Sequence, residues 1–319
     1  MRVYSLATAM LIGTVCVLMV KPAQAAPIAS GDWFVGDYKD WGTGSIFHYD
    51  SSGALIETAA SIISEPRGME VGPDGNLYVC DKDDDVRQFQ GTNFLVHADV
   101  ITSGPNGPGA LAFGPDGNLF IGNGGLGNVQ RYNGPFNSPF FGGQVSPFAD
   151  VSLGSPGAMA FGPDGRLYVN DAGNVGDIES YSGLTANTDR ILFISDSVNI
   201  TSPQGITFGP DNNLYVAVSA GNKILRYQGP LGGSPGTLID TFVGMIFAPF
   251  GIHFGGDGNL YVTSASSTSI QRYQGPSGAS PGTLIDVFAT LPAGTVPLYL
   301  TQAPVPPPPP GVGTFMILR

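Results

Sequence analysis

The sequence predicts an all-β protein, a six-bladed β-propeller with four-stranded blades. Three observations predict this fold. A segment of the type Phe-Gly-Pro-Asp-Gly-Asn-Leu-Tyr-Val occurs five times, the copies are almost evenly spaced, and the 319 residues include 47 glycines and 27 prolines. A repeat of roughly 40 to 50 residues that contains several short strands is typical of propellers. Abundant turn residues without a three-residue period also fit an all-β chain.

The five copies of this segment are interpreted as hairpin turns. Their aspartates are Asp74, Asp116, Asp164, Asp211 and Asp257, separated by 42, 48, 47 and 46 residues. Proline presets φ for a turn, aspartate hydrogen-bonds to the backbone that follows it, and glycine accepts a positive φ. Gly-Pro-Asp-Gly therefore predicts a reversal between the first and second strands of a repeat, in preference to a metal loop or a phosphate loop.

Four strands are expected in each repeat. In the repeat that contains Asp211 they are expected at 205–208, 213–218, 223–228 and 236–243. Each segment combines alternating, β-branched or aromatic residues, and clusters of Gly, Pro, Asn or Ser separate the segments. The other repeats follow the same order.

The sixth blade is expected to be divided between the two ends of the chain. Segments 32–38, 45–50 and 54–60 match the second, third and fourth strands of a repeat that lacks its first strand. A spare strand at 296–301 follows the last complete repeat. We expect this C-terminal strand to complete blade 1, because a closed ring leaves no blade incomplete and protects the sheet edges.

Both ends of the chain are expected to lie outside the propeller. Residues 1–25 combine Arg2, an apolar run and a small-x-small site at 23–25, which predicts a cleaved signal peptide and a secreted or periplasmic protein. The propeller is expected at 26–302. A tail at 303–319 contains five consecutive prolines, which form an extended and disordered segment instead of a packed element.

The composition limits the partners and the redox chemistry. The net charge is −12, and removal of residues 1–25 takes away two basic residues and no acidic one, which gives −14. Such a chain repels nucleic acid and anionic lipid, so we expect neither partner. The apolar end of the tail is too short to cross a bilayer, so no membrane span is expected in the mature chain. A small molecule, a glycan or a protein on the channel face is the expected ligand of a monomer. Cys80, the one cysteine outside the signal peptide, is expected as a small buried apolar residue instead of a reactive thiol.

Oxygen-bearing side chains follow the second strands of blades 1 to 4. They are Asp37, Asp81, Asn123 and Asp171, and the loop after Asp81 adds Asp83 and Asp85. Ca²⁺ and Mg²⁺ prefer oxygen ligands, so Asp37, Asp81, Asp83, Asp85 and Asp171 are the candidate metal ligands. The loop is not an EF-hand, because Val86 stands where that motif has glycine. The alternative interpretation is a set of aspartates that end strands and cap turns.

The repeat Pro-x-Gly-[Ile/Met]-x-Phe-Gly-Pro-Asp-Gly-Asn-Leu-Tyr-Val, followed by Asn-x-Ile-x-Arg-Tyr, resembles the NHL-repeat propellers that bacteria secrete. The resemblance covers about 31–301. It implies the propeller architecture without fixing a function, since that superfamily includes gluconolactonase-like lactonases, streptogramin B lyases, peptide-amidating lyases and binding propellers without chemistry.

The tail resembles a PEP-CTERM sorting signal. Val305, Pro306 and Pro308 match that signal, whereas Pro307 stands where it has glutamate. The apolar span that follows in the family is missing, and plain disorder is the favoured interpretation.

The resemblance implies two enzymatic alternatives. A metal-dependent, lactonase-like hydrolase would need a carboxylate, an Asn and an Asp around an ion that polarises a carbonyl, for which Glu70, Asn123 and Asp171 are the candidates. A lyase similar to streptogramin B lyase would need a histidine as base or zinc ligand, and His253 lies on an expected channel-lining strand.

The remaining histidines, His48 and His97, are expected away from the channel. No complete catalytic set can be assembled from these residues. We therefore favour a binding or scaffold propeller, with Ca²⁺ or Mg²⁺ on its aspartate-rich face as an open question. The hydrolase is the first alternative and the lyase is the second.

Overall fold

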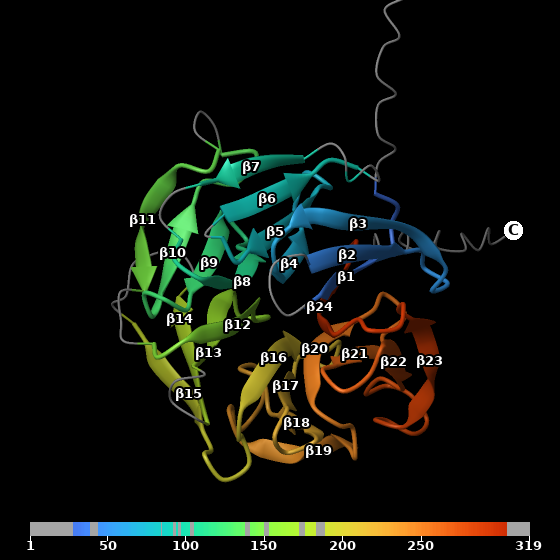
Figure 1. Cartoon of the computed structure of the whole chain (residues 1–319). Coiled ribbons are helices and arrows are strands. Elements are labelled where there is room, and N and C mark those ends of the chain that lie inside the picture. Colours follow the sequence, from blue (N-terminus) through green and yellow to red (C-terminus); the bar gives the residue numbers. More distant parts are fainter. Residues whose placement is uncertain are drawn as a thin grey trace, which may run out of the picture.

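The computed structural model describes residues 28–38, 44–83, 85–91, 94, 97–102, 105–137, 141–149, 153–171, 176–182 and 189–304. Within these ranges, six four-stranded antiparallel sheets surround a central axis, and no residue is helical (Figure 1). The predicted six-bladed propeller is therefore confirmed. The predicted signal peptide lies outside the described residues, as does the tail after residue 304.

The strands of each blade run outward from the axis. Blade 1 contains β24 (Pro297–Gln302), β1 (Trp33–Asp37), β2 (Gly44–Tyr49) and β3 (Leu55–Ile63). Blade 2 contains β4 (Pro66–Val71), β5 (Leu77–Asp81), β6 (Asp85–Phe89) and β7 (His97–Ile101). Blade 3 contains β8 (Pro108–Phe113), β9 (Leu119–Asn123), β10 (Asn128–Tyr132) and β11 (Gln144–Ala149).

The second half of the ring repeats this order. Blade 4 contains β12 (Pro156–Phe161), β13 (Arg166–Asp171), β14 (Asp177–Ser182) and β15 (Ile191–Ser195). Blade 5 contains β16 (Pro203–Phe208), β17 (Leu214–Val218), β18 (Lys223–Tyr227) and β19 (Leu238–Gly244). Blade 6 contains β20 (Pro249–Phe254), β21 (Leu260–Ser264), β22 (Ser269–Tyr273) and β23 (Leu284–Thr290). The expected strands agree with these bounds within a few residues.

The C-terminal strand closes the ring. β24 pairs with β1 in antiparallel register from Trp33 opposite Gln302 to Asp37 opposite Pro297. The pairing continues beyond the strand, since the backbone N–H of Ala303 donates to the carbonyl of Asp32 at 2.7 Å. Ala303 is also buried, so this residue, which we had expected in the tail, belongs to the propeller.

The Gly-Pro-Asp-Gly segments are hairpin turns, as expected. In the copy of blade 5, Asp211 accepts hydrogen bonds from the backbone N–H of Asn213 at 3.2 Å and from the Tyr215 hydroxyl at 2.9 Å. Asn212, which replaces the second glycine, has a left-handed φ of 61°. The aspartate therefore fixes both the turn and the first aromatic residue of the strand that follows it.

That aromatic ring also joins neighbouring blades. Tyr215 lies edge-on to Phe254 of blade 6, with ring centroids 4.8 Å apart. The same edge-on contact recurs as Tyr78–Phe113, Phe120–Phe161 and Tyr168–Phe208. At the closure of the ring, Tyr261 and Trp33 pack with tilted ring planes and centroids 4.1 Å apart. A Cβ atom on Gly209 would lie 2.6 Å from the Tyr215 ring. The first glycine of the turn is therefore required by this packing.

The innermost strands approach one another closely around the axis. A Cβ atom on Gly205 of β16 would lie 2.6 Å from the carbonyl oxygen of Phe250 on β20. Each innermost strand pairs on one edge with the second strand of its blade, and its other edge faces the axis. The wall of the channel consequently combines small side chains with backbone polar groups.

We expect Gly209→Ala to destabilise the fold, because its methyl group would overlap the Tyr215 ring and the Asp211 carboxylate. The expected loss is roughly 1–3 kcal/mol of unfolding free energy, or about 2–4 °C in Tm per kcal/mol. Thermal unfolding followed by circular dichroism measures it. Gly233→Ala is the matched control, since its Cβ would meet no atom within 4 Å. Equal melting temperatures for the two variants would contradict this account.

Candidate functional site

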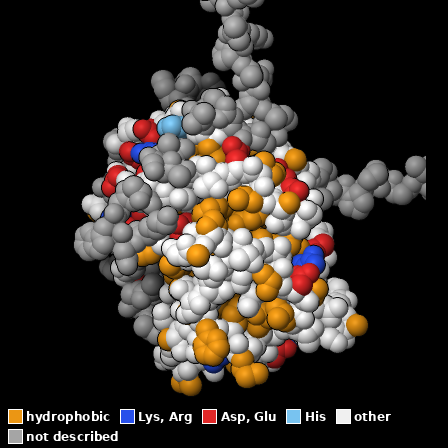
Figure 2. Space-filling model, turned by 45° about the vertical axis from the view of Figure 1, so that its right-hand side comes forward, with side chains coloured by type: hydrophobic (Ala, Val, Ile, Leu, Met, Phe, Trp, Pro, Cys, Tyr) orange, Lys and Arg blue, Asp and Glu red, His pale blue; other side chains and the backbone are white. Residues whose placement is uncertain are grey.

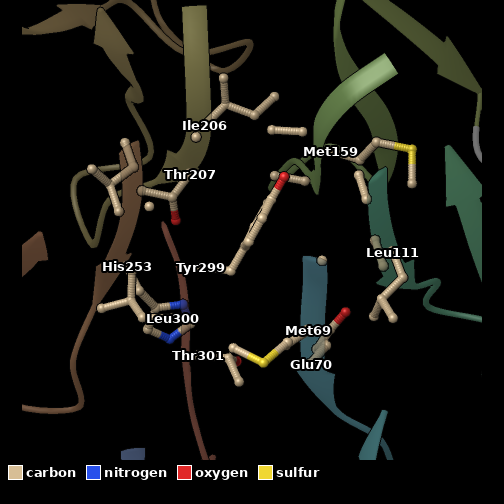
Figure 3. Close-up of a pocket in the computed structure, with 18 of the residues that line it drawn as sticks. Met69, Glu70, Leu111, Met159, Ile206, Thr207, His253, Tyr299, Leu300 and Thr301 are labelled. Carbon is tan, nitrogen blue, oxygen red and sulfur yellow. The ribbon is translucent and has the colours of Figure 1, made fainter. Parts of the chain in front are cut away.

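The six innermost strands enclose an axial cavity of about 290 Å³ (Figure 3). Each of these strands begins with a proline, and the fifth residue from that proline faces the cavity. In blades 1 to 6 the fifth residues are Thr301, Glu70, Ala112, Ala160, Thr207 and His253. Most of the remaining wall is apolar, from residues such as Met69, Met159 and Ile206. The cavity is therefore an apolar chamber with a few polar side chains on one level.

Tyr299 of β24 lies across the middle of this cavity. It is the third residue of its strand, where the other five blades have only glycine or alanine. Figure 3 shows its hydroxyl directed toward the side of the cavity that carries Met159 and Ile206. The ring packs edge-on against Phe250 at 5.2 Å, and burial raises the pKa of the phenol to about 12. Tyr299 therefore remains neutral and narrows the channel.

Glu70 is the one acidic side chain among the described residues of the cavity wall. Its Oε2 accepts a hydrogen bond from the backbone N–H of Phe113 at 2.8 Å, across the boundary between blades 2 and 3. Burial raises the pKa of the Glu70 carboxyl to about 7, and the hydrogen bond from Phe113 opposes this rise. Within the described residues, Oε1 has no hydrogen-bond partner and is available to a ligand.

His253 lies on β20, the innermost strand of blade 6. Blade 1 separates it from Glu70, which lies on β4 of blade 2. Burial lowers the pKa of its imidazole to about 4, so the ring is neutral at neutral pH. Its nearest aromatic neighbour is Trp33, edge-on at 5.7 Å, and among the described residues it forms no hydrogen bond. β24 separates β4 from β20, so Thr301 stands between Glu70 and His253 on the same level of the ring.

Sequence reasoning missed Tyr299 and Thr301. The strand 296–301 was assigned to ring closure, and its residues were not compared with the cavity-facing positions of the five complete repeats. Aligning Pro297 with the prolines that begin the other innermost strands places Thr301 at the fifth position. That signal is present in the sequence and could have identified both residues.

The residues that end the second strands have a structural role. Asp37 accepts a hydrogen bond from the backbone N–H of Val296 at 2.7 Å, Asp81 from Ser64 at 3.1 Å, and Asp171 from Ser155 at 3.2 Å. Asn123 accepts from Asn106 at 3.3 Å in the same way. Each donor lies in the connector that leads into the innermost strand of the same blade. These four side chains are fully buried and fasten the connectors.

The predicted catalytic residues therefore lie at two different levels. Asn123 pairs with Pro108 and Asp171 with Pro156, at the start of the innermost strands, whereas Glu70 is the fifth residue of its strand. Four residues of strand correspond to about 13 Å. The structure therefore places Glu70 on the same level of the cavity as Thr301 and His253, whereas Asn123 and Asp171 lie at the other end of the innermost strands.

The aspartate-rich loop of blade 2 lies on the side of the connectors. Asp81 forms an ion pair with Arg87 at 3.3 Å, and the Ser64 hydroxyl donates to Asp83. Asp85 begins β6, and burial, with the negative charge of Asp99, raises its pKa. Among the described residues, no three His, Cys, Asp or Glu side chains form a group that could hold a metal ion. A cation bound by Asp37, Asp81, Asp83, Asp85 or Asp171 stays a prediction.

Cys80, His48 and His97 lie where the sequence places them, away from the cavity. Cys80 is buried, and burial raises the pKa of its thiol, so it behaves as a small apolar residue. His48 bridges two carboxylates inside blade 1, with Asp32 at 2.9 Å and Glu57 at 3.3 Å. His97 begins the outermost strand of blade 2 and is exposed.

No family model and no curated protein matches the chain. Solved structures do match its fold. A chain in the crystal structure of a nidogen/laminin complex has 18% sequence identity and a TM-score of 0.67, and the match covers 86% of this chain and 98% of that chain. A catalytically inactive virginiamycin B lyase variant from Staphylococcus aureus, solved with quinupristin, has 16% identity and a TM-score of 0.56, with 83% and 87% covered.

Both matches extend over more than four fifths of this chain. The β-propeller fold that the resemblance implies is confirmed, and identities below 20% carry neither a family nor an activity across. The described residues contain no helix that is long and apolar enough to cross a membrane.

Glu70 and His253 should make opposite contributions to the pH dependence of stability. The raised pKa of Glu70 means that the folded state holds more protons than the unfolded state between about pH 4.5 and 7, so its contribution falls as pH rises through that window. The lowered pKa of His253 means that the unfolded state holds more protons between about pH 4 and 6.5, so its contribution rises with pH.

Denaturant unfolding as a function of pH tests this assignment. Glu70→Gln should make the unfolding free energy rise more steeply with pH than in the wild type between pH 4.5 and 7. His253→Asn should make it rise less steeply between pH 4 and 6.5. Parallel curves for wild type and both variants would show that neither side chain is desolvated in the folded state.

Proposed function

We propose that this chain is a binding propeller that holds one small, largely apolar ligand in its axial cavity. One observation carries the proposal. Polar groups of Glu70, Thr207, His253 and Tyr299 line an apolar cavity, and within the described residues the Glu70 Oε1 and the other three side chains have no hydrogen-bond partner in the protein. An apolar pocket with a few convergent polar groups is the usual form of a small-molecule site.

The size of the cavity limits the ligand. A volume of about 290 Å³ lies at the lower end of the range for small-molecule sites. Tyr299 divides the channel, so the ligand occupies a chamber instead of threading through the ring. The face seen in Figure 2 carries apolar side chains over its middle, and charged side chains lie nearer its outline. The wall of the cavity itself is mostly apolar, which favours an apolar group over a highly charged one.

The hydrolase and lyase alternatives have less support from the geometry. The hydrolase needs Glu70, Asn123 and Asp171 together, but the last two are fully buried and hold connectors. The lyase needs a histidine beside further catalytic groups. His253 is neutral and able to accept a proton, yet its neighbours on the same level are the hydroxyls of Thr207 and Thr301.

Filling the cavity tests the proposed site. Ala160→Phe should place a ring in the chamber and abolish saturable binding of small aromatic fragments, for which we expect Kd values on the order of 1 mM in the wild type. Titration calorimetry with a panel of neutral, cationic and anionic fragments measures this. Ala265→Phe, in an exposed loop, is the control and should bind as the wild type does. Absence of any saturable binding, or equal binding by Ala160→Phe, would overturn the proposal.

A second candidate function, binding of a protein partner, is favoured by the connector between blades 5 and 6. Met245 is 93% exposed and Phe247 is 71% exposed, although both are large and apolar. Between them, Ile246 is buried and its backbone N–H donates to the carbonyl of Asn222 at 3.2 Å. Met245 also has a left-handed φ of 58°. The connector thus holds two apolar side chains outward at a cost in backbone energy, which is typical of binding surfaces.

Site-specific photo-crosslinking tests this second function in the organism's own extract. A photoreactive residue in place of Phe247 should yield one discrete crosslinked product. The same residue in place of Ile56, an exposed apolar position on outer strand β3, is the control and should yield none. The same products from both positions, or none from position 247, would dismiss the connector as a docking site.

A further inference from the structure

We propose that the ligand of the axial cavity is a small organic cation, an amine with an apolar body, whose ammonium group pairs with Glu70. This inference rests on the proposed function, because it names the chemical class of the ligand for the same cavity. Its evidence is the arrangement of charge, aromatic rings and unpaired polar atoms around Glu70.

Within the described wall of the cavity, Glu70 is the one side chain that becomes charged near neutral pH. Among the residues of the cavity wall that the structure describes, none is Lys, Arg or Asp, and the only titratable groups besides Glu70 are His253 and Tyr299. His253 is neutral because burial lowers its pKa to about 4, and Tyr299 is neutral because burial raises its pKa to about 12. A cation in the cavity therefore meets no competing positive charge.

The strands packed against Glu70 add no counter-charge. β8 and β24, which lie on either side of β4, contain no acidic or basic residue, and β5 carries Asp81 at its opposite end. Arg67 lies on β4 itself but pairs with Glu65 at 3.0 Å. The Glu70 carboxylate is therefore stabilised by one backbone hydrogen bond, from Phe113. A ligand ammonium beside Oε1 would supply the missing counter-ion.

The rest of the wall suits the apolar body of an amine. Tyr299 and Phe250 present aromatic rings at 5.2 Å from each other, and aromatic faces attract ammonium groups. Met69 and Met159 add flexible, polarizable side chains that adapt to an apolar body. The net charge of −12 raises the local concentration of cations around the protein. An anionic ligand would meet Glu70 and this field without any basic partner.

Proton linkage gives the inference a distinctive consequence. The pKa of Glu70 is about 7 in the free protein, so a large fraction of the carboxyl groups is protonated near neutral pH. Pairing with an ammonium group favours the ionised carboxylate and lowers that pKa. Binding of an amine at pH 6.5 should therefore release protons to the buffer, whereas binding of a neutral ligand of the same shape should not.

The test compares benzylamine with benzyl alcohol, which differ in charge and little in shape. Titration calorimetry of the full chain at pH 8 should give benzylamine at least about a tenfold lower Kd than benzyl alcohol. At pH 5, where Glu70 is protonated and benzylamine is still an ammonium, the preference should largely vanish. Titrations at pH 6.5 in two buffers of different ionisation enthalpy should show release of protons with benzylamine only.

Variants test whether Glu70 causes the preference for benzylamine over benzyl alcohol. Glu70→Gln should abolish the preference for the amine at pH 8 and keep the binding of benzyl alcohol. Glu57→Gln removes the same charge on outer strand β3, away from the cavity, and should keep the preference. This control also reveals any general effect of a changed net charge.

The outcomes separate this inference from the proposed function. If both probes bind with similar Kd values and Glu70→Gln changes neither, the ligand is not recognised through its charge, and the cavity remains a site for neutral ligands. If the preference persists in Glu70→Gln, the cation is held elsewhere and the inference is wrong. If neither probe nor any other fragment of the panel binds, both the inference of an amine ligand and the proposed function are wrong.

Discussion

One repeated contact supports the rest of the structure. In four of the five turns the aspartate accepts a hydrogen bond from the tyrosine near the start of the second strand, and the tyrosine ring packs on the next blade, as Tyr215 does between Asp211 and Phe254. In blade 3, Phe120 makes the interblade contact without this hydrogen bond. The contact requires a glycine at the start of the turn, because any side chain at Gly209 would overlap the ring. Turn, strand position and blade interface therefore depend on the same few atoms, which explains why the whole segment repeats as a unit.

This coupling is also the reason that the fold could be predicted from the sequence. A segment that must satisfy a turn, a hydrogen bond and an interblade contact at once has little freedom to vary, so its five copies are recognisable. The three-stranded blade at the N-terminus and the spare strand at the C-terminus followed from counting strands, and β24 pairs with β1 as that count required. The position of Ala303 could not be predicted, since its backbone pairing with Asp32 depends on the closed ring.

The candidate site was predicted only in part. Sequence patterns give the type of each side chain and the order of the strands, but they do not give the position of a residue along the propeller axis. Glu70 and His253 were placed correctly on innermost strands. Asn123 and Asp171 were grouped with Glu70 because their oxygens suit a metal, but strand register puts them at the other end of the innermost strands. Their oxygen atoms hold connectors, a task that repeats in several blades and so produces a pattern resembling a ligand set.

The functional asymmetry of the ring arises where the repeat is broken. In the five complete blades, a Gly-Pro-Asp-Gly turn ties the innermost strand to the second strand, and the third position of the innermost strand is small, as at Gly205, where β20 approaches. β24 has no such turn, since it comes from the other end of the chain, and it alone carries a large residue, Tyr299, at this position. A perfectly repeated ring would present six similar walls to a ligand. Ring closure by a separate strand therefore completes the propeller and also gives the cavity, which we propose as the ligand site, one wall that differs from the others, with Tyr299 and Thr301 beside Glu70.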